Sequence, residues 1–280
     1  MKVAFTSDYH IDTFRQSIAE RIIDETVSFL IENKVDILSY AGDMSSSLKT
    51  TFKKLNSIKK QYEIQTGNCL EVFAVPGNHE MWDRQYRNEP YGALNEFEAL
   101  CDQYDIKHSF FSYKGYYFIG EMGWYNYSTA HPSFSKKELE KMTYAGSVWS
   151  DKDYVNFGKS SNEHVASFFT SKLEESIKKV PQHLTNQIVL VTHIVPFIEF
   201  VERKNDPSWD YFNAFIGNQQ IGLLAEKYKV RIAQFGHTHK KYHSNISGIE
   251  CICSPLGYKG EWSTDNVSEE IKKSIKILKL

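Results

Sequence analysis

The sequence predicts an α/β fold with mainly parallel strands, and two observations support this prediction. Through the first half of the chain, short apolar runs alternate with segments whose apolar residues recur at helical spacing. This alternation is typical of right-handed βαβ units. In addition, polar residues with ligand atoms follow five of the apolar runs, as expected at the carboxyl edge of a parallel sheet.

The individual elements follow in order from these patterns. Residues 3–5, 37–40 and 72–75 are apolar runs of strand length. Ile18, Ile22, Val27 and Leu30 recur at helical spacing within residues 13–33, and similar spacing predicts helices around 52–58 and 94–104. In the second half we expect strands at 116–119, 188–191 and 230–235, a helix at 163–179, a hairpin of residues 241–244 and 249–253, and a lysine-rich helix that closes the chain.

Two aromatic-rich segments, near residues 122–157 and 197–215, fit no regular period. No repeat, linker or low-complexity stretch separates them from the rest of the chain. With 280 residues and 41% hydrophobic content, the chain can bury a large core. We therefore expect one domain over residues 1–280 with two insertions.

The overall composition narrows the classes of partner and setting. The formal net charge is -2, and no basic stripe with interleaved aromatic residues is visible, so nucleic acid is not a favoured partner. The four cysteines form no disulfide pattern, and no signal segment or membrane-spanning run is present. We expect a reduced, cytoplasmic setting and no membrane partner. The sequence leaves the oligomeric state undetermined.

The five segments at the predicted strand ends carry candidate metal ligands. They are Asp8-Tyr9-His10, Gly42-Asp43, Gly77-Asn78-His79-Glu80, Thr192-His193 and Gly236-His237-Thr238-His239. Mixed carboxylate, amide and imidazole ligands suit Mn, Fe or Zn better than Ca. Asp43 stands alone after its strand and could bridge two ions roughly 3.5–4 Å apart. Asp8 and His10 can face one ion, whereas His237 and His239, at the same spacing, could share one ion or serve two.

Gly42, Gly77 and Gly236 each precede a candidate ligand at a strand-to-loop turn. We expect them to adopt backbone conformations that other residues resist and to bring the ligand backbone close to the metals.

The order of these segments resembles the calcineurin-like metallophosphoesterase superfamily, whose pattern is DxH, GD, GNH(D/E), a later single H and GHxH. The resemblance covers residues 8–239, and Ser254-Pro255-Leu256-Gly257 is similar to the turn after the family's final hairpin. It implies a four-layer α-β-β-α sandwich of two mixed sheets flanked by helices. It also implies two divalent metal ions, for which we expect Mn, with Fe or Zn as alternatives.

The resemblance further implies a division of the ligands between two metals. One metal would be bound by Asp8, His10, Asp43 and His239, and the other by Asp43, Asn78, His193 and His237. A hydroxide that bridges the metals would attack phosphorus in line. His79 carries over as the catalytic residue that protonates the leaving oxygen or binds the phosphoryl group. Asn78 would also stabilise the phosphoryl oxygens.

One departure from the family argues against a protein phosphatase. The protein Ser/Thr phosphatases continue their GD segment as GDxxDRG, whereas this chain reads Gly42-Asp43-Met44-Ser45-Ser46-Ser47. The carboxylate that orients the catalytic histidine in those enzymes is therefore absent. Asp83 is another candidate partner for His79, and the role of Glu80 is open.

For the substrate we expect a small phosphodiester or a nucleotide. The aromatic segments, with Trp124 as a candidate, could stack on a planar group, although core packing under long loops is the commoner use. Arg84 and Arg87 could bind a second phosphate, although such arginines more often lie on a solvated surface. Two alternatives stay open: a nuclease acting on nucleic acid and a non-catalytic scaffold on the same fold.

Overall fold

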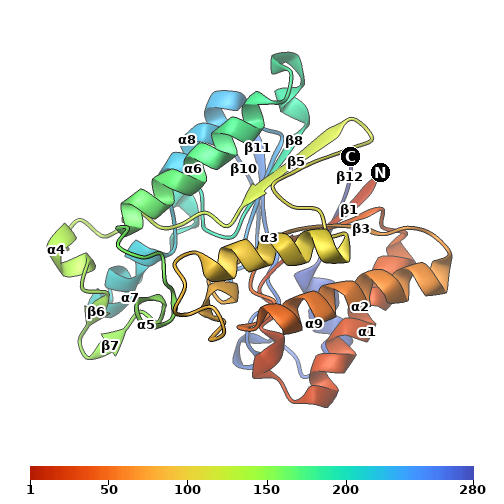
Figure 1. Cartoon of the computed structure of the whole chain (residues 1–280), viewed down its shortest axis with the longest axis horizontal. Coiled ribbons are helices and arrows are strands. Elements are labelled where there is room, and N and C mark those ends of the chain that lie inside the picture. Colours follow the sequence, from red (N-terminus) through yellow and green to blue (C-terminus); the bar gives the residue numbers. More distant parts are fainter.

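Two β-sheets packed face to face form the centre of the computed structural model, which describes residues 1–280 (Figure 1). The first sheet has the order β12-β1-β2-β3, with β1 at Lys2–Thr6, β2 at Ile37–Ala41, β3 at Glu71–Val75 and β12 at Lys276–Lys279. The second has the order β10-β11-β9-β8-β5-β4, with β10 at Tyr242–Ile246, β11 at Ile249–Cys253, β9 at Ile232–Phe235, β8 at Ile188–Thr192, β5 at Tyr116–Glu121 and β4 at Phe110–Tyr113. Both sheets are mixed, because β12, β10 and β4 run antiparallel to their neighbours and the other pairs are parallel.

Helices cover the outer faces of the two sheets (Figure 1). Beside the first sheet lie α1 at Gln16–Asn33, α2 at Leu48–Thr66, α3 at Gly92–Tyr104 and α9 at Val267–Ser274. Beside the second lie α6 at Asn162–Lys178 and α8 at Gln219–Tyr228. The predicted α/β sandwich of two mixed sheets flanked by helices is therefore confirmed.

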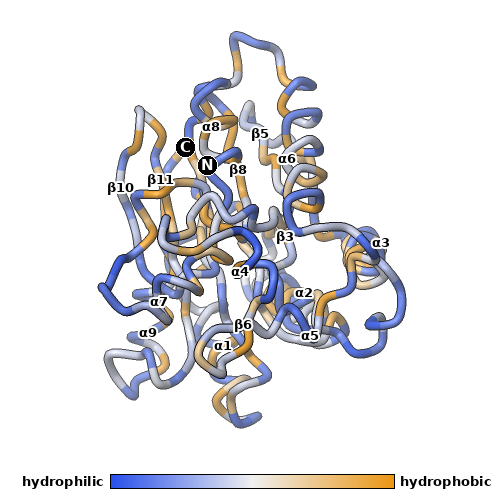
Figure 2. The backbone as a smooth tube through the Cα atoms, turned by 90° about the vertical axis from the view of Figure 1, so that its left-hand side faces the viewer, coloured by the Kyte–Doolittle hydropathy of each residue, from blue (hydrophilic) through white to orange (hydrophobic).

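Helix α1 illustrates how the sequence pattern becomes a packed layer. Ile22, Val27 and Leu30 lie on its buried face, and each such side chain contributes about 1.5–3 kcal/mol when it leaves water. The helix ends where Lys34 turns into the left-handed region at φ 53°, with its N–H donated to the carbonyl of Ile31. Figure 2 shows the result for the whole chain: hydrophobic stretches run along the inner strands, and the outermost loops are mostly hydrophilic.

The layer between the sheets is apolar except for the buried amide of Gln234 and the Ser39 hydroxyl that donates to it. Eleven buried hydrophobic residues from both sheets form this layer, among them Phe5, Phe73 and Val191. Gln234 on β9 reaches across it: its Nε2 donates to the carbonyls of Thr6 and Ser39, each at 3.0 Å, and its Oε1 accepts from the Ser39 hydroxyl. This glutamine therefore joins the two sheets through hydrogen bonds as well as through packing.

The structure departs from the predicted elements in two places. The lysine-rich helix is present as α9, but it does not close the chain, because β12 follows and pairs antiparallel with β1. The sequence pattern also does not predict β4, which pairs with β5 at the edge of the second sheet. Each of these strands is only four residues long, which is too short for a clear sequence pattern. Their formation depends on pairing, of β12 with the distant β1 and of β4 with the neighbouring β5.

The two aromatic-rich segments contain short elements that pack against each other. Residues 122–157 form α4 at Lys136–Leu139, β6 at Thr143–Tyr144, β7 at Ser147–Val148 and α5 at Asp151–Tyr154, and residues 197–215 contain α7 at Pro207–Phe212. The rings of Tyr144 and Tyr211 stack at 5.0 Å, and those of Trp149 and Phe215 at 5.5 Å. Across the whole structure, every helix is too short or too polar to cross a membrane.

Replacing Gln234 by leucine should lower the free energy of unfolding by on the order of 3 kcal/mol, because buried carbonyls and a hydroxyl would lose their partner. Urea denaturation of the variant measures this loss. Gln65→Leu, on an exposed position of α2, is the matched control and should stay within about 0.5 kcal/mol of the parent chain. Equal losses in the two variants would contradict the role assigned to Gln234.

Candidate metal centre

Residues that follow five strands meet at one edge of the paired sheets. Asp8, Asp43 and Asn78 follow β1, β2 and β3 of the first sheet, whereas His193 and His237 follow β8 and β9 of the second. Since these strands are parallel within each sheet, their carboxyl ends lie together. Candidate ligands that are far apart in the sequence thereby become neighbours.

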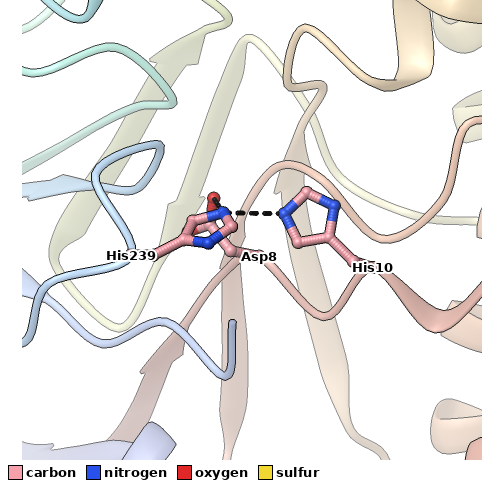
Figure 3. A group of neighbouring side chains, drawn as sticks. All are labelled: Asp8, His10 and His239. Carbon is pink, nitrogen blue, oxygen red and sulfur yellow. Dashed lines mark hydrogen bonds and ion pairs between the residues drawn. The ribbon is translucent and has the colours of Figure 1, made fainter. Parts of the chain in front are cut away.

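Asp8, His10 and His239 form the first group of candidate ligands (Figure 3). The Nε2 atoms of the two histidines lie 2.8 Å apart, and Nε2 of His239 lies 3.6 Å from Oδ1 of Asp8. Oδ2 of Asp8 is buried and has no hydrogen-bond partner. Two ring nitrogens that converge beside a buried carboxylate with one unpaired oxygen are an arrangement that fits a cation.

Asp43, His193 and His237 form the second group. Nε2 of His193 lies 3.3 Å from Oδ2 of Asp43, 3.1 Å from Nδ1 of His237 and 3.1 Å from Oδ1 of Asn78. The opposite ring nitrogen of His193, Nδ1, donates to the carbonyl of Ala41 at 2.8 Å. A ring N–H held by a backbone carbonyl is the usual support of a metal-binding histidine, because it leaves the other nitrogen free.

Asp43 lies between the two groups. Its Oδ2 is 3.7 Å from Nε2 of His10 on one side and 3.3 Å from Nε2 of His193 on the other. Its Oδ1 accepts the backbone N–H of His79 at 2.9 Å, which fixes the orientation of the carboxylate. This is the position expected of a carboxylate that two ions share. The seven predicted ligands thus meet in two adjacent groups, with His239 in the first and His237 in the second.

The electrostatics of the site favour a positive charge between these side chains. Burial opposes ionisation of Asp43, but His193 and His79 hold the pKa of its carboxyl well below the usual range. Burial lowers the pKa of His193, yet Asp43 and Asp8 raise it to about 10. Burial brings the pKa of His237 down to about 3, so its imidazole is neutral and can act as a ligand. The donor set therefore fits divalent metal ions of the Mn, Fe or Zn type.

Five of the candidate ligands adopt left-handed backbone conformations although none of them is glycine. They are Asp8 (φ 55°), His10 (φ 42°), Asp43 (φ 61°), His237 (φ 71°) and His239 (φ 53°). Each such residue costs about 1–2 kcal/mol. Hydrogen bonds between the loops hold them in place: Asp8 N–H donates to the Gly42 carbonyl at 2.9 Å and His10 N–H to the Asp43 carbonyl at 3.0 Å.

The glycines beside the ligands meet two different needs. Gly42 has φ +86°, as the sequence predicts. Gly77 and Gly236 are not in the positive-φ region, so this part of the expectation is wrong for them. They provide space instead: a Cβ at Gly77 would lie 2.0 Å from Oδ1 of Asp43, and one at Gly236 would lie 2.6 Å from Oδ2 of Asp8.

Glu80, whose role the sequence leaves open, is a buried anchor for the ligand loops. Its carboxylate accepts the backbone N–H groups of Asp43 at 2.9 Å, Met44 at 2.7 Å and Gly77 at 2.7 Å, and the hydroxyl of Thr51 at 3.1 Å. Burial and the nearby Asp43 raise the pKa of Glu80 to about 7. One carboxylate thereby joins the loops that follow β2 and β3.

His79 lies beside the candidate ligands and is held mainly by aromatic contacts. Its ring packs on the indole of Trp82 with centroids 3.7 Å apart, and its Nε2 lies 3.5 Å from the Tyr258 hydroxyl and 3.9 Å from Oδ2 of Asp43. Asp83, the partner suggested by the sequence, does not contact it. The Asp83 carboxylate instead accepts the backbone N–H at the start of α2 at 2.8 Å.

Sequence reasoning does not identify several side chains that contact the candidate ligands or His79. One is Trp82, which packs on His79. Glu261 accepts from Nδ1 of His239 at 2.8 Å, and the ring of Tyr258 lies 4.4 Å from that of His10. Asp151 accepts a hydrogen bond from Asn78. Glu261 and Tyr258 follow the turn at residues 254–257, and this turn is the one sequence feature that could have drawn attention to them. Asp151 lies in the first aromatic-rich segment, where no motif marks it.

The structure does not bring the three predicted substrate contacts to the site. Arg84 is exposed, and Arg87 donates to the carbonyl of Asp153 at 2.7 Å. Neither arginine lines a cavity beside the ligands. Trp124 is buried, stacks on Tyr125 at 4.5 Å and donates to Asn162 at 2.8 Å. Core packing, the commoner use of such residues, therefore applies to Trp124.

Two cavities open beside the candidate ligands. The larger, of about 370 Å³, is lined by ten residues that include His79, Trp82, Val148 and Tyr258. The smaller, of about 240 Å³, has walls that include Phe200, Glu202, Trp209, Phe212, Lys240 and Tyr242. Trp149, His237 and His239 border both cavities. The cavities therefore meet at the ligands, and both aromatic-rich segments contribute to their walls.

Gly77→Ala should abolish metal binding, because its Cβ would displace the Asp43 carboxylate that lies between both ligand groups. Calorimetric titration of the metal-free variant with Mn²⁺ measures this effect. Gly260→Ala is the matched control, since a Cβ there meets open space and the backbone is unstrained. Unchanged Mn²⁺ affinity in Gly77→Ala would contradict the placement of Asp43.

Comparison with known proteins places these features in a family. The family model described as calcineurin-like phosphoesterase matches residues 1–241. Protein L509 of Acanthamoeba polyphaga mimivirus is 23% identical, with 94% of this chain and 93% of that protein covered. The DNA double-strand break repair protein Mre11 of Methanocaldococcus jannaschii is 25% identical over 112 residues, and this match spans 38% of the chain and only 31% of that protein.

Solved structures with low sequence identity share the fold. A phosphopantetheinyl hydrolase from Mycobacterium tuberculosis superposes with a TM-score of 0.77 at 15% identity, covering 99% of this chain and 95% of that one. A dimetal phosphatase from Danio rerio superposes with a TM-score of 0.50 at 14% identity, covering 90% and 86% of the two chains. The family match over residues 1–241 shows that the chain belongs to the calcineurin-like phosphoesterases, which are metal-dependent phosphoester hydrolases, and these structures share its fold.

Proposed function

We propose that this chain hydrolyses a small phosphodiester, with the phosphoryl group at the two ligand groups and one organic substituent in each cavity. The observation that carries this proposal is the meeting of the two cavities at His237 and His239. A phosphomonoester has one organic substituent and would leave one cavity unfilled. A nucleotide diester, with a planar base for the aromatic walls, is the form we favour.

The proposed cofactors are two divalent metal ions, Mn²⁺ in first place and Fe or Zn as alternatives. Asp8, His10, Asp43 and His239 would hold one ion, and Asp43, Asn78, His193 and His237 the other. When bound, such ions lower the pKa of water and polarise phosphoryl oxygens. The unpaired Oδ2 of Asp8 and the converging ring nitrogens support this assignment.

In this proposal His79 is the residue that gives a proton to the leaving oxygen. It lines the larger cavity and points Nε2 toward the hydroxyl of Tyr258 and the carboxylate of Asp43. The Trp82 indole behind the ring restricts its rotation. The amide oxygen of Asn78 faces His193, and one N–H of its NH₂ group donates to Asp151. The second N–H would stabilise charge on the phosphoryl oxygens together with the ions.

The walls of the two cavities support a small organic substrate over nucleic acid. Lys240 is the sole lysine or arginine among the residues that line them, and Glu202 and Glu261 add negative charge. Binding of a nucleic acid backbone depends on neutralising several phosphates with lysine or arginine. A nuclease, suggested by the partial likeness to Mre11, is therefore the second candidate.

We also propose that residues 1–280 act as one domain, because both aromatic-rich segments contribute to the cavities beside the ligands. The proposed cytoplasmic, reducing setting is supported by four free cysteines, of which Cys69 is exposed.

The test of this function compares bis-p-nitrophenyl phosphate with p-nitrophenyl phosphate, with Mn²⁺ added and after chelation. We expect faster turnover of the diester, loss of activity with chelator and recovery with Mn²⁺. A second panel contains nucleotide diesters, a phosphopantetheinyl compound and single-stranded DNA, the last two because of the likenesses to the phosphopantetheinyl hydrolase and to Mre11. Activity that survives complete chelation, or turnover of the monoester alone, would overturn the proposal.

His79→Ala should lower kcat for the diester by about 10²–10⁴-fold, the usual worth of a positioned general acid. Binding of Mn²⁺ should change little, because His79 is not one of the seven proposed ligands. Steady-state kinetics and Mn²⁺ titration measure the two effects. His183→Ala is the control, since His183 is exposed in the turn before β8, at the opposite end of that strand from His193. Wild-type kcat in His79→Ala would remove His79 from the mechanism.

A further inference from the structure

Asp151, at the start of α5, is a buried carboxylate that receives three side-chain N–H groups. Only 2% of it is exposed. Its Oδ1 accepts from Nδ2 of Asn78 at 2.9 Å and from Nε1 of Trp82 at 2.7 Å, and its Oδ2 accepts from Nε1 of Trp149 at 2.8 Å. No lysine, arginine or histidine forms an ion pair with it. A buried carboxylate without an ion pair is costly, so its position depends on these three donors.

The first of these bonds determines which end of the Asn78 amide faces the site. An amide can present either its oxygen or its NH₂ group, and only the oxygen binds a metal ion. Because Nδ2 donates to Asp151, Oδ1 is directed toward Nε2 of His193, 3.1 Å away. Without an acceptor at Asp151, the amide would lose the interaction that fixes this orientation.

The second bond extends the same constraint to His79. The Trp82 indole that donates to Asp151 packs on the His79 ring at 3.7 Å, with 31° between the two planes. On its other side Trp82 packs on Tyr154, which also belongs to α5, at 5.2 Å. The indole is therefore held at its edge by Asp151 and at its face by Tyr154, and it limits the rotation of His79.

We propose that Asp151 is a positioning residue for this centre: it orients the Asn78 amide and, through Trp82, the His79 ring. The residue comes from the first aromatic-rich segment and lies outside every ligand motif. The part that concerns Asn78 requires only that the site binds metal. The part that concerns His79 rests on the proposed hydrolytic function.

Asp151→Asn tests the first part by Mn²⁺ binding to the metal-free full chain, with free Mn²⁺ measured by electron paramagnetic resonance. An asparagine at position 151 has one acceptor oxygen and one NH₂ group in place of two acceptor oxygens. The NH₂ group must face N–H donors that it cannot accept from, either that of Trp149 or those of Asn78 and Trp82. We expect the affinity for the Mn²⁺ ion whose proposed ligands include Asn78 to fall by about 10- to 100-fold, and the affinity for the other ion to change less. Asp153→Asn, which removes an exposed carboxylate from the same helix, should leave both affinities unchanged.

A double variant separates positioning from general damage to the fold. Adding Trp149→Phe to Asp151→Asn removes the indole N–H that would face the new NH₂ group, so the asparagine oxygen can accept from Asn78 and Trp82. We expect this second substitution to restore most of the lost Mn²⁺ affinity. Losses that add instead, or wild-type affinity in Asp151→Asn alone, would overturn the proposal.

Trp82 tests the second part without altering a buried charge. Trp82→Ala should lower kcat for the diester at least tenfold, because the His79 ring loses the surface on which it packs. Trp82→Phe retains a ring beside His79 and should recover most of kcat. Wild-type kcat in Trp82→Ala would overturn the link to His79. If no diester is hydrolysed by the wild-type chain, the proposed function fails, and the Mn²⁺ measurements still decide the role of Asp151.

Discussion

The packing of the two sheets against each other is the constraint on which the site depends. Three ligand loops follow strands of one sheet and two follow strands of the other, so neither sheet holds a complete ligand group. The apolar layer between the sheets sets their separation, which is about 10 Å for stacked sheets. Gln234 fixes how they are aligned, because it bonds to both β1 and β2 and lies two residues before Gly236. A one-residue slip of β9 would reverse the faces of its side chains and separate the two halves of the centre.

Behind the candidate ligands, three carboxylates each control a different kind of group. Glu80 collects backbone N–H groups and fixes the paths of the loops after β2 and β3. Glu261 accepts the ring N–H of His239, and Asp151 accepts the amide of Asn78. The orientations of His239 and Asn78 thus depend on partners from separate parts of the chain. Loss of a supporting contact of this kind commonly lowers metal affinity by about 10- to 100-fold.

The sequence predicts the layered fold, and it marks the seven candidate residues that the structure brings together, because their signals are local. A ligand residue directly after an apolar run, as in Asp8 or His193, is visible without knowledge of the fold. Asp151 has no such signal, since its partners Asn78 and Trp82 lie about 70 positions earlier. Arg84 and Arg87 illustrate the converse, because closeness to His79 in the sequence does not guarantee a place beside the cavities. They are close to His79 in the sequence, but the chain turns away after Trp82, and Arg87 ends on the carbonyl of Asp153.

The left-handed backbone at five candidate ligands has a consequence for how this chain can change over generations. Every one of these residues lowers the stability of the fold, so replacement by a residue suited to the same turn, such as glycine, would remove strain. Natural proteins sit little above the stability they need, and a stabilising substitution is readily accepted when function is not required. A lineage released from selection for catalysis would therefore lose its ligands early and keep its sheets.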